Sequence, residues 1–289
     1  MKTIQDKFIT LRDGRTLAYT EHGDLSGQPV FMIHGNPSSR LMRHPDESIV
    51  ENLGARIITP DRPGYGLSDF QPNRTLLDFP DDIAQLADAL GIEKFAIFGV
   101  SAGGPYAAAC AYKLADRITQ VALVSGVSTL DRPNAYDDMS EAWQTAFKTG
   151  NWPEWLLRQV LKLRVRAERR DPEKAIDDMA ALMSLADAKL MLRPEFHAGI
   201  RRRVYEATRN GTRGWAREIK VLVAPWGFDP AEITVPVHLW YWEDDPAVPQ
   251  QMGRYFESKI PNTIPHFLPG GGHLFFLVHW GEIIEALIA

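Results

Sequence analysis

The chain has 289 residues, of which 45% are hydrophobic and 24% are charged, with a formal net charge of −5 and one cysteine. This composition is ordinary for a globular protein and argues against disorder. The single cysteine, Cys110, excludes an internal disulfide framework and a cysteine-rich zinc site. The negative net charge gives no support for nucleic-acid binding. At roughly 150 residues per domain, the length allows one large domain or two small ones.

Two segments bear on membranes and secretion. Charged residues interrupt Met1–Lys7 where a signal peptide needs an apolar core, so we expect no secretion signal. The longest uncharged run, Phe95–Tyr112, contains Gly, Ser and Pro and divides into a strand, a turn and a helix. We therefore expect no membrane span. A lone cysteine suits a reducing compartment, and we expect a cytoplasmic protein.

The first 130 residues alternate short apolar runs with helical stretches, which indicates a mostly parallel sheet covered on both faces. A hairpin is expected at the start because Asp13-Gly14 suits a tight turn. The expected strands are Phe8–Leu11, Thr16–Thr20, Val30–Ile33, Arg56–Thr59, Phe95–Val100 and Val121–Val124, and the expected helices are Asp81–Leu90 and Ala102–Leu114.

The pattern changes over residues 131–229, which contain helical stretches and no clear strand. The elements expected there and beyond are helices Trp152–Arg170 and Pro172–Leu192, strands Val235–Trp242 and Thr263–Leu268, and a closing helix His273–Ile288. We predict an α/β fold with a mostly parallel, eight-stranded sheet flanked by helices. Its core comprises residues 1–130 and 230–289, and residues 131–229 form an inserted helical cap, or lid.

The insertion carries 18 Lys and Arg against 15 Asp and Glu, although the whole chain is acidic. One basic cluster lies within 158–170 and another is Arg201-Arg202-Arg203. Such clusters are typical of solvated helix faces. A surface that steers an anion or binds a partner is the alternative.

The sequence Gly99-Val100-Ser101-Ala102-Gly103 lies between an apolar strand and an Ala-rich helix. A G-x-S-x-G in this context predicts a nucleophile elbow, a strained turn that presents the serine at the sheet edge. The flanking glycines prevent side-chain collisions, and the following helix directs its positive end towards the serine. A tight structural turn with an incidental serine is the alternative.

A serine hydroxyl needs a base, and the base needs an orienting carboxylate. Hydrolases with this elbow carry them in the chain order serine, acid, histidine. His273 is the candidate base because it follows three glycines that allow a loop to approach the serine. The acid is expected in the loop after Val237–Trp242, where Asp245 is preferred and Asp244 remains open.

The negative oxygen of a tetrahedral intermediate needs N–H donors. One is the backbone N–H of the residue after the nucleophile, Ala102. The second is expected from the loop His34-Gly35-Asn36-Pro37, where the backbone N–H of Asn36 is the candidate. The imidazole of His34 is expected to support the turn.

With these motifs the sequence resembles the α/β-hydrolase superfamily, and within it the helical-capped esterases and proline-iminopeptidase-like hydrolases. The segments that carry the resemblance are His34–Pro37, Asp61–Ser68, Gly99–Gly104, Asp245–Pro249 and Gly271–His273, which follow the family order. The resemblance implies Ser101 as nucleophile, Asp245 as acid, His273 as base, and Asn36 and Ala102 as the oxyanion hole. It implies a structural turn at Asp61–Ser68.

Two departures qualify this resemblance, and the identity of the nucleophile narrows it further. Trp242 stands where many relatives carry glycine before the acid loop, and it either narrows the space near Asp245 or packs under the cap. Ala102 and Asn36-Pro37 replace the tryptophan and the glycine-rich loop of proline iminopeptidases, which weakens the aminopeptidase interpretation. Ser101 excludes the related dehalogenases and epoxide hydrolases, because they use aspartate there.

We therefore predict a serine hydrolase that cleaves a carboxylic ester of a small, hydrophobic substrate through an acyl-serine intermediate. Hydrolysis of a carbon–carbon bond or of a peptide bond by the same triad is the alternative activity. A non-catalytic ligand-binding protein is the alternative class, because fold alone does not establish function. We expect no metal or organic cofactor and a small-molecule partner, with no nucleic acid or membrane. The sequence leaves the oligomeric state open.

Overall fold

The computed structural model describes residues 4–289. The prediction that Met1–Lys7 is no secretion signal therefore falls partly outside the described residues. Within the described residues, eight strands form one sheet in the order β1-β2-β4-β3-β5-β6-β7-β8. Strand β2 pairs antiparallel with β1 and β4, and all other pairs are parallel. The predicted mostly parallel, eight-stranded α/β sheet is confirmed.

The strands are β1 (Lys7–Thr10), β2 (Thr16–Gly23), β3 (Gln28–Ile33), β4 (Ala55–Pro60), β5 (Phe95–Val100), β6 (Ile118–Val124), β7 (Val237–Trp242) and β8 (Thr263–Leu268). The α-helices are α1 (Ser48–Asn52), α2 (Phe79–Ala89), α3 (Gly104–Lys113), α4 (Glu141–Lys148), α5 (Glu154–Arg170), α6 (Pro172–Ala180), α7 (Leu185–Met191), α8 (Pro194–Ala207), α9 (Arg213–Val223), α10 (Gln250–Lys259) and α11 (Trp280–Ile288). Short 3-10 turns are η1 (Leu76–Asp78), η2 (Ser101–Gly103), η3 (Thr149–Asn151), η4 (Pro230–Glu232) and η5 (Phe275–Leu277).

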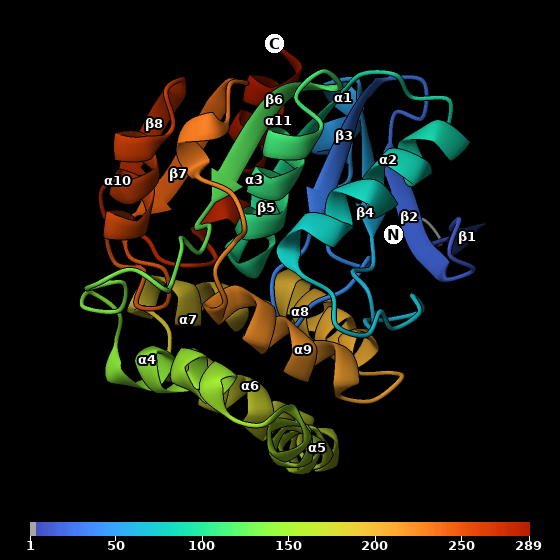
Figure 1. Ribbon diagram of the computed structural model, residues 1–289. Coiled ribbons are helices and arrows are strands. Elements are labelled where there is room, and N and C mark those ends of the chain that lie inside the picture. Colours follow the sequence, from blue (N-terminus) through green and yellow to red (C-terminus); the bar gives the residue numbers. More distant parts are fainter. Residues whose placement is uncertain (1–3) are drawn as a thin grey trace.

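Helices cover both faces of the sheet (Figure 1). Helices α2, α3 and α10 pack on one face, where Ile97, Leu123 and Leu239 contribute to a buried apolar cluster. Helices α1 and α11 pack on the other face, where Phe98 and Trp240 belong to a second cluster. The strands β5 and β7 are buried along their whole length because both faces are covered, as the continuous apolar sequence of β5 predicts.

Helices α4–α9, called here the inserted helices, lie between β6 and β7 in the chain. They gather below one edge of the sheet, at the bottom of Figure 1. Because the chain passes from the end of β6 into the inserted helices, these helices lie at the carboxyl ends of the parallel strands. The loops that follow β3, β5, β7 and β8 therefore face the inserted helices.

The predicted strands agree with the structure to within three residues at each boundary. Two helix predictions are wrong. The stretch 172–192 forms two helices, α6 and α7, because the Ser184 hydroxyl accepts a hydrogen bond from the Asp187 N–H and starts a new helix. The closing helix begins at Trp280 and not at His273, which lies in a loop. Among residues 4–289, no helix combines the length and apolarity that a bilayer crossing requires.

Candidate active site

The turn after β5 has the geometry of a nucleophile elbow. Ser101 has a φ of 56°, a left-handed conformation that a side chain makes costly. A Cβ atom on Gly99 would lie 2.2 Å from the Gly103 carbonyl oxygen, and one on Gly103 would lie 2.2 Å from the Ile33 oxygen. Only glycine fits at these two positions. The strained turn and the need for its glycines are as the sequence predicted.

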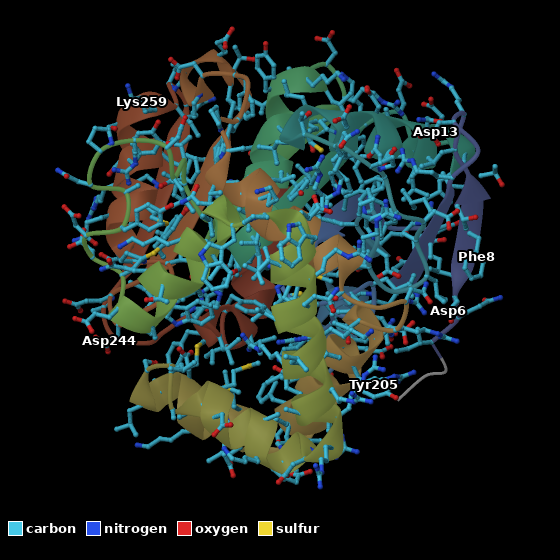
Figure 2. All side chains as sticks on the ribbon, turned by 60° about the horizontal axis from the view of Figure 1, so that its bottom comes forward. Asp6, Phe8, Asp13, Tyr205, Asp244 and Lys259 are labelled. Atoms are coloured by element: carbon cyan, nitrogen blue, oxygen red, sulfur yellow. The ribbon has the colours of Figure 1, made fainter. Side chains whose placement is uncertain are left out.

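The loop after β8 brings His273 against a carboxylate from the loop after β7. The Nδ1 atom of His273 lies 2.7 Å from Oδ2 of Asp245, whose side chain is fully buried. The other oxygen, Oδ1, accepts hydrogen bonds of 2.9 Å from the N–H groups of Ala247 and Val248. Asp244 is exposed at the molecular surface (Figure 2). Of the two candidate acids, only Asp245 contacts the histidine.

Two opposing effects set the proton affinity of His273. Burial lowers the pKa of the imidazole, but the charge and hydrogen bond of Asp245 outweigh it, so the pKa lies above the ordinary value. A pair of this kind holds the Nδ1 proton towards Asp245 and leaves Nε2 to accept a proton. His273 and Asp245 together can therefore supply an oriented general base.

A third carboxylate holds the histidine loop, and sequence reasoning missed it. Asp187, on α7 of the inserted helices, accepts hydrogen bonds from the backbone N–H groups of His273 at 2.8 Å and Leu274 at 2.7 Å. Its side chain is buried, and burial raises the pKa of its carboxyl group. A Cβ atom on Gly272 would lie 2.1 Å from an Asp187 oxygen. This glycine thus allows the loop to approach the inserted helices, a contact that the sequence prediction did not include.

The candidate oxyanion donors lie beside the serine. Asn36 and Ala102 line the same cavity as Ser101 and His273. The Tyr65 hydroxyl, from the turn 61–68, donates a 2.7 Å hydrogen bond to Oδ1 of Asn36 and thereby fixes that side chain. The loop after β3 is thus tied to the turn after β4.

The imidazole of His34 lies in the same turn as Asn36 and is fully buried. Its Nδ1 lies 2.8 Å from the Gly35 oxygen, and its Nε2 lies 3.3 Å from the Arg62 N–H. Burial lowers the pKa of His34 well below its ordinary value, so the ring is neutral. Because both nitrogens contact backbone groups, His34 supports the turn, as expected.

The serine opens into a cavity of about 530 Å³ between the sheet edge and the inserted helices. Its walls are largely apolar, which suits a small organic ligand. The inserted helices contribute Trp143, Phe147, Leu161, Met179, Trp215 and Ile219 to this lining. Of the five tryptophans in residues 131–229, Trp143 and Trp215 face the cavity, Trp226 packs in the core, and Trp152 and Trp155 are exposed.

Trp242 does not line the cavity. Its ring is fully buried within the apolar cluster on the α11 face of the sheet. A Cβ atom on Gly271 would lie 2.8 Å from Cδ1 of this ring, so the tryptophan packs directly beneath the histidine loop. Of the two roles predicted for Trp242, narrowing the space near Asp245 or packing, its buried position agrees with packing.

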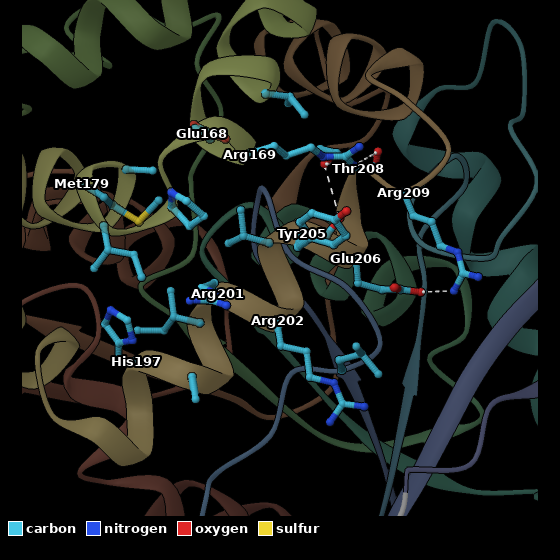
Figure 3. Close-up of a pocket in the computed structure, with 18 of the residues that line it drawn as sticks. Glu168, Arg169, Met179, His197, Arg201, Arg202, Tyr205, Glu206, Thr208 and Arg209 are labelled. Atoms are coloured by element: carbon cyan, nitrogen blue, oxygen red, sulfur yellow. Dashed lines mark hydrogen bonds and ion pairs between the residues drawn. The ribbon is translucent and has the colours of Figure 1, made fainter.

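A second cavity of about 730 Å³, called here the outer cavity, is lined by residues of α5, α6 and α8 together with Asp6 and Arg40, and Figure 3 shows its arginine-rich lining. None of Ser101, Asp245 and His273 lines it. Among its arginines, Arg209 forms an ion pair with Glu206, and Arg201 forms one with Glu173. Among residues 4–289, no three His, Cys, Asp or Glu side chains lie close enough to hold a metal ion.

Comparison with known proteins gives one family and several relatives. A family model described as alpha/beta hydrolase fold matches residues 28–279. The uncharacterized hydrolase YcgS of Bacillus subtilis is 33% identical over 116 residues, which cover 40% of each chain. The 3-oxoadipate enol-lactonase 1 of Acinetobacter baylyi is 31% identical over 104 residues, which cover 36% of this chain and 39% of the lactonase. The matched segments thus span about two fifths of these relatives.

Among solved structures, a thermophilic esterase from Thermogutta terrifontis superposes with a TM-score of 0.69 at 25% identity. The superposition covers 98% of this chain and 96% of the esterase. The similarity therefore includes the inserted helices as well as the sheet.

Proposed function

The chain belongs to the α/β-hydrolase fold family, and on that premise we propose that it is a serine hydrolase that cleaves a carboxylic ester of a small, hydrophobic substrate. The observation that carries the proposal is the 2.7 Å contact between His273 and the buried Asp245, beside an apolar cavity whose wall includes Ser101 in a strained turn. Similarity to an esterase and to an enol-lactonase supports ester chemistry in particular.

In the proposed reaction, His273 removes the proton of the Ser101 hydroxyl as its oxygen attacks the ester carbonyl carbon. The carbon–oxygen bond to the alcohol then breaks, and His273 returns the proton to the departing alkoxide. A water molecule, deprotonated by the same imidazole, attacks the acyl-serine. This step releases the carboxylic acid and restores the serine hydroxyl.

We assign the backbone N–H groups of Asn36 and Ala102 to the negative oxygen of each tetrahedral intermediate. Loss of one such donor typically costs about 3 kcal/mol in the barrier. We assign the inserted helices, within the predicted boundaries 131–229, the role of a cap that excludes water and shapes the cavity. Their aromatic lining favours a hydrophobic acyl or alcohol group.

The test uses a panel of p-nitrophenyl esters with wild-type protein and the variants Ser101→Ala and His273→Ala. We expect both variants to lose kcat by roughly 10³-fold or more, because triad members act as a unit. Asp245→Asn is expected to lose a similar amount, whereas Asp244→Asn, a matched change at the exposed neighbour, should retain wild-type activity.

Covalent labelling by a fluorophosphonate probe separates the proposal from its alternatives. The wild type should be labelled at Ser101 and the Ser101→Ala variant should not. Full esterase activity in Ser101→Ala would refute the mechanism. Absence of labelling in the folded wild type would favour a ligand-binding protein.

A further inference from the structure

Arg203 places a positive charge in the wall of the active-site cavity. The residues Phe196, Ile200 and Ala207 form the buried face of α8. Arg203 follows Ile200 by three positions and precedes Ala207 by four, so helical periodicity puts it on the same inward face. An apolar residue is expected at this position, and Arg203 instead lines the cavity together with Ser101 and His273.

The two preceding arginines behave differently. Arg201 and Arg202 are exposed and line the outer cavity of Figure 3, whereas Arg203 is half-buried and lines the inner one. Helix α8 therefore directs the three arginines of the predicted basic cluster 201–203 towards two different cavities. Only its third member is directed towards the candidate catalytic residues.

Within residues 4–289, the Arg203 guanidinium has no counterion. Among the residues that the structure describes, none forms an ion pair, a hydrogen bond or a ring contact with this side chain, although Arg40, Arg62 and Arg74 each pair with a carboxylate. Burial alone lowers the pKa of Arg203 to about 10, with no opposing contribution from a nearby acid. The side chain is still charged at neutral pH.

The charge lies close to the catalytic groups. It lowers the pKa of His273 and also contributes to the low pKa of His34. An unpaired, partly desolvated guanidinium is costly unless an anion neutralises it. Its planar donor groups match a carboxylate in a two-point contact. The cavity wall is otherwise largely apolar, and its other arginine and its lysine, Arg164 and Lys174, pair with carboxylates of the protein, which suits a substrate with one anionic end.

We propose that Arg203 binds a carboxylate group of the substrate, so that the preferred esters are those that carry a free carboxylate at the far end of an aliphatic chain. This inference rests on the proposed function, because it assumes that Ser101 attacks the ester group of the same molecule. It assigns Arg203 the role of a specificity-determining residue and narrows the substrate to monoesters of dicarboxylic acids.

The experiment compares the mono-p-nitrophenyl ester of adipic acid with the same ester whose terminal carboxylate is replaced by a carboxamide. The two probes have nearly the same shape and differ in charge. We expect the wild type to prefer the carboxylate by roughly 10- to 100-fold in kcat/KM, the usual value of a hydrogen bond to a charged group. Arg203→Gln should abolish this preference, Arg203→Lys should restore part of it, and the matched control Arg202→Gln should leave it unchanged.

Equal hydrolysis of the two probes by the wild type, or an unchanged preference in Arg203→Gln, would overturn the proposal. Fluorophosphonate labelling of Ser101 in Arg203→Gln shows that the variant is folded. Calorimetric titration of Ser101→Ala with adipate tests Arg203 without catalysis. Adipate binding that is lost in the Ser101→Ala, Arg203→Gln double variant would support the proposal. Absence of adipate binding to Ser101→Ala would count against it. Failure of the wild type to label at Ser101 would count against the proposed function, whereas adipate binding to Ser101→Ala tests carboxylate binding by Arg203 independently of it.

Discussion

Among the inserted helices, α8 and α9 (the inner helices) are attached to the rest of the molecule differently from α5 and α6 (the outer helices). Helices α8 and α9 reach the core through charged groups: Glu206 on α8 pairs with Arg40 at 2.8 Å, and Glu218 on α9 lies 2.9 Å from Arg62 and 2.8 Å from Arg74. The pairs around Glu218 are buried on both sides.

Among residues 4–289, α5 and α6 lack such connections to the core. Their side-chain hydrogen bonds and ion pairs stay within one helix, reach the segment between α8 and α9, or end on another inserted helix, as between Arg217 and Glu154 or Arg201 and Glu173. Helix α5 also exposes apolar side chains, including Trp155 and Leu163. The difference indicates that α8 and α9 fix the geometry of the cavity, whereas α5 and α6 form its outer cover.

The largest expected effect comes from breaking the attachment of α9. In Glu218→Gln, Arg62 and Arg74 stay buried without a counterion, and removal of one partner from such a group costs about 3–5 kcal/mol in the free energy of unfolding. Urea unfolding measures this loss. The matched change Glu154→Gln, at a partly exposed pair between α5 and Arg217 of α9, should cost less than about 1 kcal/mol. Equal losses in the two variants would contradict the comparison.

A smaller effect is expected at the contact between α7 and the histidine loop. Asp187→Asn weakens two charge-assisted hydrogen bonds to backbone N–H groups, so it should cost about 1–3 kcal/mol in the free energy of unfolding. It should also lower kcat more than it raises KM, because it loosens His273 without touching the cavity wall. Steady-state kinetics with a p-nitrophenyl ester measures kcat and KM separately. A change in KM alone would refute this prediction.

Two still smaller effects are expected on the pH dependence of kcat/KM, and they have opposite signs. In the proposed mechanism, the acid limb of kcat/KM reports the pKa of His273, which must be neutral to act as a base. The Asp187 charge raises this pKa and the Arg203 charge lowers it. Asp187→Asn should therefore move the acid limb to lower pH, and Arg203→Gln should move it to higher pH. Shifts in the same direction would show that these groups do not act through their charges.

The smallest effect is expected on the outer face. Trp155 on α5 is 66% exposed, so Trp155→Ser should change the free energy of unfolding by less than about 0.5 kcal/mol and leave kcat/KM unchanged. Urea unfolding and ester hydrolysis measure the two quantities. A clear loss of activity would show that the exposed face of α5 also affects the geometry of the cavity.

Much of the core could be predicted from the sequence because its signals are local. Apolar runs marked the strands, and the glycines around Ser101 marked the strained turn. The choice between Asp244 and Asp245 was not local, since it depends on how the loop after β7 folds. There, two backbone N–H groups hold one Asp245 oxygen and direct the other to His273.

The residues that sequence reasoning missed act across the boundary between the sheet and the inserted helices. Asp187 lies 86 positions before His273, and no motif joins them. The spacing of Ser184 and Asp187 is typical of a helix start and could have divided the predicted helix 172–192. Arg203 was visible only as part of a basic cluster, and its position among Phe196, Ile200 and Ala207 was the available signal.

The contact between Gly272 and Asp187 has a consequence for engineering. The backbone of the histidine loop is held by a carboxylate that belongs to the segment between β6 and β7. A chimera that exchanges this segment for that of another hydrolase removes the acceptor along with the cavity wall. Such a transplant therefore needs an equivalent carboxylate at the position of Asp187, and it needs glycine at position 272 to receive it.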